Sequence, residues 1–344
     1  MNNALYNALT AEDCAKKLKD LAKEGKKVLI IAHRNPDGDA VGSAFALKMI
    51  YENLGGKAYT ACAHEIPNYL KFMEMGENKL ITEIPEDYDI IITVDTAAPT
   101  QFGELEYLCD KVDFAIDHHA SCTEYSDSYR DSAACAAGEL IFRIYDILIA
   151  ENAISEIPDA ARLIYAAISA DSGSFKYSNT TKNTHITAAK LVDIINNDKN
   201  GINCAEIARL LHDSATLTDL KAKKLCIENL NITEDGKIAY VCLEKEMFEK
   251  EGLSELDFGA SIDIPRSIEG VMAAFVLKEG KFDEEENKTN YRISARSNCN
   301  INVANICAKF GGGGHAKAAG GAIKAENINI ALEAVLSEFI EAAK

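Results

Sequence analysis

Two patterns of hydrophobic and polar positions alternate along the first two-thirds of the chain. Apolar runs of strand length, several of them rich in β-branched residues, predict strands at residues 28–32, 57–62, 89–94 and 112–116. Apolar positions with helical spacing predict helices from residues 10 and 40, and helices at 66–75, 135–150, 160–170 and 183–195. Strands that alternate with helices favour an α/β fold whose parallel sheet is covered on both faces.

A polar, turn-rich segment at residues 196–201 is typical of the start of a linker. Helical patterns follow at 204–211 and 217–228, then strand candidates at 237–242, 269–278 and 291–297, and helices at 303–308 and 328–343. We therefore predict a first domain at residues 1–196, linker helices at 197–228 and a smaller α/β domain at 229–344.

The loop after the strand at 28–32 gathers polar side chains that one structural role does not explain. His33, Asp37 and Asp39 lie within seven residues, and Gly38 between the two aspartates permits a tight turn. An aspartate that caps the following helix would account for Asp39 but not for His33 and Asp37. Such a loop lies at the carboxyl end of a strand, where open α/β sheets place their ligands.

Residues 37–41 also fit the D-x-D-x-T/V motif of phosphatases that form an aspartyl-phosphate. In that motif the nucleophile follows its strand almost directly, whereas residues 33–36 intervene here. A histidine grouped with aspartates is instead a ligand set for hard or borderline divalent cations such as Mn²⁺. We therefore favour a metal site over a phosphorylated aspartate.

Further acidic and imidazole side chains follow the next two buried strands. Asp95 ends the strand at 89–94, and a run of Asp117, His118 and His119 ends the strand at 112–116. The carboxyl ends of parallel strands share one edge of the sheet, so these groups should lie near the first loop. Asp171 follows a helix, and the chain must fold back to bring it to the same edge.

Four carboxylates placed together would repel one another and raise each other's pKa. Two divalent cations would neutralise Asp37, Asp39, Asp95 and Asp171. Such a pair, roughly 3.5–4 Å apart, activates a water and stabilises in-line displacement at phosphorus. We predict purely structural roles for three other histidines: His64, His185 and His212.

Composition narrows the class of protein. The chain has 344 residues and a net charge of −18, which disfavours a long basic track for nucleic acid. No apolar run reaches about 18 residues, so we expect no membrane span. Residues 1–10 lack a signal-peptide pattern, and the ten cysteines form no C-x-x-C pair. We therefore expect a cytoplasmic protein with reduced thiols.

The motifs together resemble the DHH phosphoesterases. The similarity is strongest to the two-domain branch that contains bacterial nanoRNA-degrading oligoribonucleases with pAp phosphatase activity. It runs from about residue 28 to about residue 323 and rests on six motifs: His33-x-Asn35-Pro36-Asp37-Gly38-Asp39, Asp95, Asp117-His118-His119, Asp171-Ser172-Gly173, Arg296-Ser297 and the run from Gly311 to His315.

The resemblance implies two Mn²⁺ ions, and it assigns ligands to each of them. The two ligand sets are His33, Asp37 and Asp95 for one ion, and Asp39, Asp95, His118 and Asp171 for the other. Asp95 would bridge the ions and His119 would face the scissile phosphate. Asp117 would orient the histidines from behind.

The second domain resembles the DHH-associated substrate-binding domain. Its predicted substrate-binding residues are Arg296, Ser297, Gly311, Gly312, Gly313, Gly314, His315 and, more weakly, Arg266. Backbone N–H groups of a glycine run can cradle a phosphate, although glycines alone also suit a flexible loop. Residues 96–101 lack the second aspartate and the arginine that often follow Asp95 in the family, and Lys176 stands where an arginine is common.

We therefore predict a Mn²⁺-dependent phosphodiesterase and phosphomonoesterase with its active site between the domains. The expected substrates are short oligoribonucleotides, linear dinucleotides or pAp, with no long nucleic-acid track and no membrane partner. Three alternatives stay open: a family II inorganic pyrophosphatase, a RecJ-type single-strand exonuclease, and a nucleotide-binding regulator whose metal site has lost catalysis. A homodimer also stays open, because the sequence is silent on oligomeric state.

Overall fold

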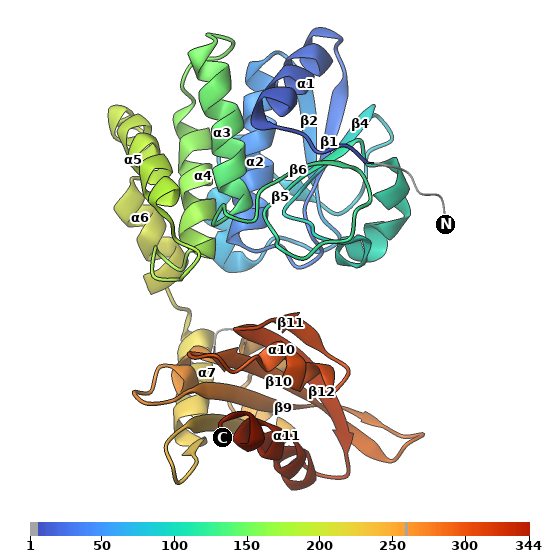
Figure 1. The fold of residues 1–344 in the computed structure, drawn as a ribbon, viewed down its shortest axis with the longest axis vertical. Helices are drawn as coiled ribbons and strands as arrows, with labels where there is room; N and C mark the ends of the chain where they lie inside the picture. The colour runs from blue at the N-terminus through green and yellow to red at the C-terminus, as the bar shows by residue number, and fades with distance from the viewer. Residues whose placement is uncertain (1–5, 259–260) are drawn as a thin grey trace. The chain divides into compact units, whose positions relative to one another are not determined.

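The chain folds as two compact units, Met1–Ser214 and Ala215–Lys344 (Figure 1). The structure is a computed structural model that describes residues 6–258 and 261–344. Half of the segment at residues 1–10, where the sequence lacks a signal-peptide pattern, lies outside the described residues. Each unit has its own sheet and its own hydrophobic core, and each is described by itself.

The first unit is built on a six-stranded sheet in the order β3-β2-β1-β4-β5-β6, and every neighbouring pair is parallel. Its strands are β1 (Lys27–Ile31), β2 (Lys57–Ala61), β3 (Leu80–Ile81), β4 (Ile90–Val94), β5 (Phe114–Asp117) and β6 (Asp127–Arg130). The predicted parallel α/β sheet is therefore confirmed, while β3 and β6 were not predicted. The strand order reverses between β1 and β4, which is the place where such sheets hold their ligands.

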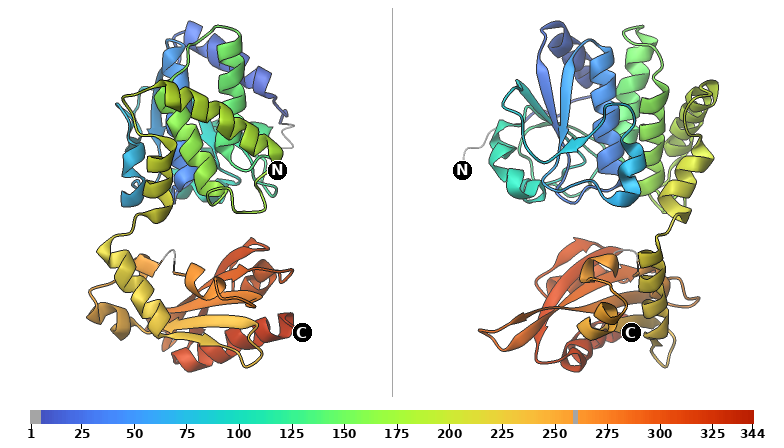
Figure 2. Two further views of the ribbon diagram at one scale, coloured as in Figure 1. Left: turned by 90° about the vertical axis from the view of Figure 1, so that its left-hand side faces the viewer. Right: turned by 180° about the vertical axis from the view of Figure 1, so that it is seen from behind.

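The long helices of this unit are α1 (Ala11–Lys23), α2 (Gly38–Asn53), α3 (Ala137–Ala150), α4 (Pro158–Asp171) and α5 (Lys182–Asn197). Of these, α2 to α5 lie side by side in one layer (Figures 1 and 2). α2 is buried along most of its length. A Cβ at Gly42 would lie 2.6 Å from the Leu163 carbonyl oxygen, so glycine is required where α2 meets α4.

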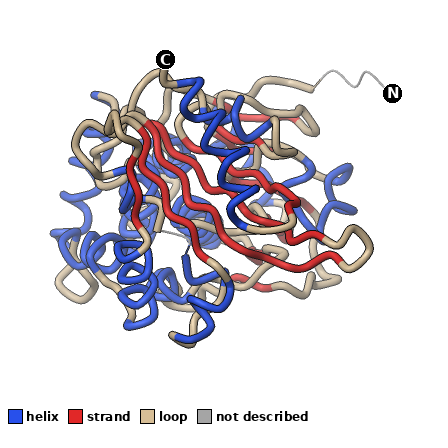
Figure 3. Tube along the Cα trace, turned by 90° about the horizontal axis from the view of Figure 1, so that it is seen from below, coloured by secondary structure: helices blue, strands red, loops and turns tan. Residues whose placement is uncertain are grey.

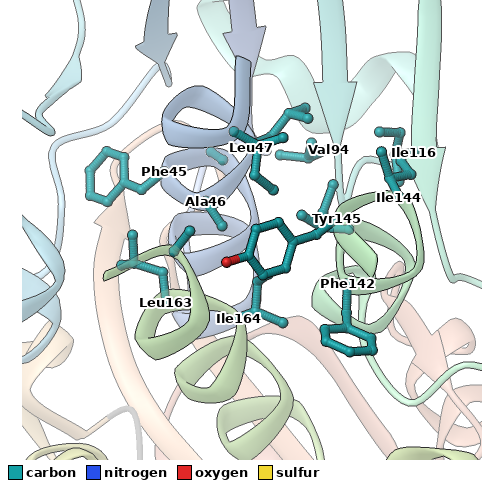
Figure 4. Packing of buried hydrophobic residues seen from close by; sticks show 14 of the residues in the cluster. Phe45, Ala46, Leu47, Val94, Ile116, Phe142, Ile144, Tyr145, Leu163 and Ile164 are labelled. Carbon is teal, nitrogen blue, oxygen red and sulfur yellow. The ribbon is translucent and has the colours of Figure 1, made fainter. Parts of the chain in front are cut away.

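The sheet is covered on both faces, as its nearly continuous apolar strands predicted. Val28 and Ile30 of β1 enter the core beneath the helical layer, where side chains of α2, α3 and α4 meet those of β4 and β5 (Figure 4). Leu29 and Ile31 enter a smaller core on the other face, against η2 (Pro99–Lys111).

Short helices complete the first unit. The helix predicted at residues 66–75 is a 3₁₀ helix, η1 (Asn68–Met73), that Pro67 precedes. α6 (Cys204–Ala208) and the π-helical turn η3 (Arg209–Asp213) end this unit. The predicted linker region therefore contributes these two elements to the first unit and α7 (Leu217–Glu228) to the second.

The second unit has a mixed sheet in the order β11-β12-β10-β9-β8-β7, in which only the β8–β9 pair is parallel. Its strands are β7 (Leu230–Ile232), β8 (Ile238–Leu243), β9 (Ala273–Asp283), β10 (Lys288–Ser297), β11 (Gly313–His315) and β12 (Ala318–Ala325).

Helices cover both faces of this second sheet. One core joins it to α7, α8 (Lys245–Lys250) and η4 (Glu255–Phe258), with α9 (Asp263–Arg266) beside them. The opposite core joins it to α10 (Val303–Ala308) and α11 (Ile328–Ala342), and Figure 3 shows the C-terminal helix lying across the strands. Within the described residues of the whole chain, every helix is too short or too polar to cross a bilayer.

Candidate metal centre

The loop between β1 and α2 brings His33 and Asp37 together. Asp37 is the N-cap of α2, and its Oδ1 accepts hydrogen bonds from the backbone N–H groups of Asp39 and Ala40, both at 3.0 Å. Its Oδ2 lies 3.7 Å from His33 Nε2. The interpretation that capping accounts for Asp39 is therefore wrong. Asp37 is the cap, and its second oxygen still faces the site.

Asp39 lies in the first turn of α2 and is buried. Its carboxylate accepts hydrogen bonds from Ala137 N at 2.6 Å, Gly138 N at 2.9 Å and Ser43 Oγ at 2.9 Å. Two of these donors are backbone amides at the start of α3, the positive end of that helix. α3 therefore fixes this carboxylate in a direction that the β1–α2 loop alone does not determine.

Asp95 follows β4 and occupies the middle of the cluster. Its φ of 52° is in the left-handed region, which is rare outside glycine and is often found at functional sites. Its Oδ2 lies 3.5 Å from His33 Nε2, and its Oδ1 lies 3.5 Å from His118 Nε2. Among the described residues, Oδ1 is buried without a hydrogen-bond donor. A buried acceptor without a donor is unusual and suggests a partner that is not a protein group.

The two histidines after β5 have different supports. His118 Nδ1 lies 3.3 Å from the Ala134 carbonyl oxygen, and this arrangement directs Nε2 toward Asp39 Oδ2 at 3.7 Å and Asp171 Oδ2 at 3.6 Å. His119 Nδ1 lies 2.7 Å from Asp117 Oδ1. The resemblance implied that Asp117 orients both histidines. In the structure, its side chain bonds to His119 and not to His118.

Asp171 reaches the site at the end of α4, which packs against the start of α2. A Cβ at Gly38 would lie 2.5 Å from Ala170 Cβ, so only glycine lets the two helix ends approach this closely. Gly38 therefore has a second role beyond the tight turn that the sequence suggested. It allows the fourth carboxylate to join the three that follow strands.

The cluster contains three groups of residues, and within each group the potential ligand atoms all lie within 4.8 Å of one another. The groups are His33 with Asp37 and Asp95, Asp39 with His118 and Asp171, and Asp95 with His118 and His119. The structure thus brings together all six metal-ligand candidates in the first unit, with Asp95 and His118 each in two groups. A donor set of carboxylates and imidazoles fits divalent cations.

The pKa shifts in the cluster show that its carboxylates are crowded together and favour positive charge nearby. Burial and the charge of Asp95 raise the pKa of Asp39, and burial with a contribution from Asp95 raises that of Asp171 to about 6. Burial alone would lower the pKa of His33 and His118, but the surrounding carboxylates raise both to about 10. Burial disfavours charge on Asp95 as well, yet these two histidines hold its pKa below its usual range. Without cations, the imidazoles must balance the carboxylates.

Two residues that hold polar or charged side chains of the first unit in place, Arg130 and Glu139, were not predicted from the sequence. Arg130 Nε donates to Asp117 Oδ2 at 3.1 Å, opposite His119, and it lies on β6, a strand that the pattern did not indicate. The buried Glu139 binds Arg143 and the Thr184 hydroxyl. No periodic signal marks such residues, because their role depends on contacts between distant segments.

In the second unit, Arg296 and His315 lie in one line across the sheet. Both residues are in register with Ala318 of β12, Arg296 from β10 and His315 from β11. Directly paired residues of antiparallel strands present their side chains on the same face. The small side chain of Ala318 therefore lies between two polar side chains on one face of the sheet.

The predicted substrate-binding residues also have partners within the chain, and Arg296 Nη1 donates to the Ala295 carbonyl oxygen at 2.9 Å. Ser297 is buried, and its hydroxyl donates to the Cys299 carbonyl oxygen. Gly311 N and Gly312 N donate to carbonyls of α10, so these two amides are used within the chain. Gly313 and Gly314 belong to the edge strand β11, and Arg266 pairs with Asp263 at 2.9 Å.

Comparison with known proteins agrees with this fold. Residues 27–168 match the DHH family, N-terminal domain, and residues 235–341 match the DHHA1 domain. The chain belongs to the DHH family of phosphoesterases.

Within that family it is 30% identical over 299 residues to the "Probable bifunctional oligoribonuclease and PAP phosphatase NrnA" of Streptococcus mutans, covering 85% of this chain and 88% of the relative. A Bacillus subtilis protein named "Bifunctional oligoribonuclease and PAP phosphatase NrnA" is 27% identical over 321 residues, covering 90% and 95%. An exopolyphosphatase-related protein from Bacteroides fragilis has the same fold, with a TM-score of 0.83 and 21% identity over the full length of both chains.

Proposed function

We propose that this chain is a Mn²⁺-dependent, two-metal phosphoesterase that hydrolyses short oligoribonucleotides, linear dinucleotides and pAp. The observation that carries the proposal is the position of Asp95. Its two oxygens face different imidazoles, and the buried Oδ1 has no hydrogen-bond donor among the described residues. A carboxylate between two ligand groups is suited to bridging a pair of cations.

The first proposed ligand set is one of the observed groups, and the second adds Asp95 to the group of Asp39, His118 and Asp171. His33, Asp37 and Asp95 would hold one cation, and Asp39, Asp95, His118 and Asp171 would hold the other. Bound cations would supply an activated water and charge stabilisation for in-line displacement at phosphorus. The hydrogen bonds of Asp37 and Asp39 to helix amides keep both carboxylates in place for this role.

His119 is the proposed contact to the scissile phosphate. Its ring is held by Asp117, which is held in turn by Arg130. Asp117 is fully buried, so this pairing fixes both the carboxylate and the direction of the imidazole. We infer that the ring donates a hydrogen bond to a phosphate oxygen, an interaction strengthened by charge.

We expect Asp117→Ala to lower kcat by roughly 10- to 100-fold, because it removes the support of His119 without removing a ligand. Arg130→Ala should act in the same direction with a smaller effect. The measurement is steady-state hydrolysis together with Mn²⁺ stoichiometry, which both variants should retain. Glu124→Ala, which removes an exposed carboxylate from the β5–β6 loop, is the matched control. Loss of bound Mn²⁺ from Asp117→Ala would contradict an orienting role.

The proposed substrates rest on the relatives and on local charge. Two relatives named oligoribonuclease and PAP phosphatase match most of this chain. Arg296 and His315 share a face of the second sheet, which suits them to hold one end of a short substrate. The net charge of −18 disfavours a longer strand, because each added phosphate meets an acidic protein.

A length series tests the substrate class. We expect kcat/KM to peak for di- to roughly pentanucleotides and to fall for longer RNA, since added nucleotides gain few basic contacts. Labelled RNAs from two to about 24 nucleotides, at low and high salt, give the rates by gel analysis. Phosphate release from pAp, measured with malachite green, tests the phosphatase activity. A preference for the longest strand would favour the RecJ-type exonuclease, and the absence of any hydrolysis would favour the regulator.

Arg296→Ala should raise KM for a dinucleotide far more than it lowers kcat, because the residue is proposed to act in binding. Rates with a small p-nitrophenyl phosphoester, which does not need the second unit, should change little. Arg292→Ala, on the same strand but paired with Glu255, is the matched control. An equal loss on both substrates would contradict a role in binding the nucleotide.

We also place the enzyme in the cytoplasm. Its ten cysteines all have free thiols, and several of them are buried in the two cores. Proteins that keep many reduced thiols belong to reducing compartments.

A further inference from the structure

A small pocket of about 180 Å³ lies beside the proposed metal centre, entirely within the first unit. Asp37, Asp39 and Asp171 line its charged side. Tyr69, Leu211 and His212 also line it, and they come from the short helices η1 and η3. None of these three residues is a candidate metal ligand. His212 was predicted from the sequence to have a purely structural role.

His212 is fixed to the helix that carries Asp171. Its Nε2 lies 3.0 Å from the hydroxyl of Ser169, which is buried on α4 two residues before Asp171. The residue itself is exposed, so this bond holds the ring at the surface of the pocket and not in the core. Partial burial of the imidazole and nearby Lys176 lower the pKa of His212. Its π-helical turn is a conformation that occurs frequently at functional sites.

Tyr69 reaches the pocket from η1 and presents much of its surface to solvent. Its side chain is 55% exposed, whereas Leu70 and Met73 of the same helix are fully buried and anchor η1 in the core. Leu70 and Leu211 both lie near Gly38, where a Cβ would be 3.7 and 3.8 Å from their side chains. An exposed aromatic ring is thus held on a fixed helix beside the carboxylates.

We propose that Tyr69, Leu211 and His212 form a subsite for the nucleobase next to the phosphate that is bound at the metal centre. Two aromatic rings and an apolar side chain suit the flat face of a base, which proteins bind by stacking without regard to sequence. A second phosphate does not suit this pocket. Its described lining residues include three aspartates and neither a lysine nor an arginine. This inference rests on the proposed function and adds a contact to the base to the proposed phosphate contact of His119.

Three probes that share a phosphate test the subsite by equilibrium binding to the full-length, Mn²⁺-loaded protein. They are inorganic phosphate, ribose 5-phosphate and AMP, measured by calorimetry. We expect Tyr69→Ala and His212→Ala each to raise the Kd for AMP by about 10-fold, the effect of losing a stacking partner. Both variants should bind phosphate and ribose 5-phosphate within about twofold of the unchanged protein. Tyr69→Phe should bind AMP normally, since stacking needs the ring and not the hydroxyl.

Tyr107→Ala is the matched control, because it removes an exposed tyrosine of η2 that does not line the pocket. Unchanged AMP binding by both alanine variants would overturn the subsite, and so would an equal loss for all three probes. A loss shared by AMP and ribose 5-phosphate would overturn the contact to the base.

The binding assay also separates this inference from the proposed function. If the unchanged protein hydrolyses dinucleotides and both alanine variants bind AMP normally, the subsite alone is wrong. If the unchanged protein hydrolyses none of the proposed substrates but the variants lose AMP selectively, the proposed function fails and the subsite stands. Because Tyr69 and His212 are exposed, we expect both variants to fold, and their melting temperatures check this.

Discussion

Asp95→Ala is expected to reduce kcat by several orders of magnitude. Asp95 is the only one of the six candidate ligands that belongs to both proposed ligand sets, so its loss would weaken both metal positions at once. It would also leave His33 and His118 without the buried carboxylate that both of them face. No single replacement elsewhere in the cluster should have so large an effect.

Two measurements check this expectation: turnover of a labelled dinucleotide, and the number of Mn²⁺ ions bound per chain. Asp95→Asn keeps the shape of the side chain but not its charge, and should also lose metal. Asp110→Ala, which removes an exposed carboxylate of η2, should behave like the unchanged protein. A near-native kcat for Asp95→Ala would show that this carboxylate does not bridge a metal pair.

Removal of divalent cations is the second change with a large expected effect. We expect EDTA to abolish hydrolysis, because the carboxylate cluster has no other source of an activated water. Mn²⁺ should restore activity best, since the cluster mixes imidazole with carboxylate ligands and Mn²⁺ accepts both.

The measurement is activity after dialysis against EDTA and titration with Mn²⁺, Mg²⁺, Ca²⁺ and Zn²⁺. Elemental analysis of the reloaded protein should give two Mn²⁺ per chain. Circular dichroism before and after chelation separates loss of catalysis from loss of structure. Full activity in excess chelator would exclude the two-metal mechanism.

Much of the architecture could be read from local sequence. The apolar runs at 28–32 and 89–94 predicted buried parallel strands, because side chains on both faces of such a strand must avoid water. The positions of His33 and Asp95 at the ends of those strands, and of His118 at the end of the strand at 112–116, then placed them at one edge of the sheet. These inferences needed only the period of the pattern and the rule that parallel strands end together.

Short elements and local caps were harder to assign. Neither β3 nor β6 was predicted, because β3 has only two residues and the four residues of β6 include no apolar run. The N-cap of α2 is Asp37 and not Asp39, because the helix begins at Gly38, two residues before its apolar pattern. A cap is set by the exact turn at which the backbone becomes helical, and periodicity leaves that boundary uncertain.

The sequence by itself determined the α/β class, the strand ends that carry the candidate ligands and the family to which the chain belongs. Only the tertiary structure decided which distant groups meet. It joined Asp171 to the strand ends through the close approach at Gly38, placed Arg130 behind Asp117, and tied His212 to Ser169 beside the carboxylates. The physical reason is that periodicity reports only which face of an element is buried. Contacts between segments far apart in sequence depend instead on how those faces pack.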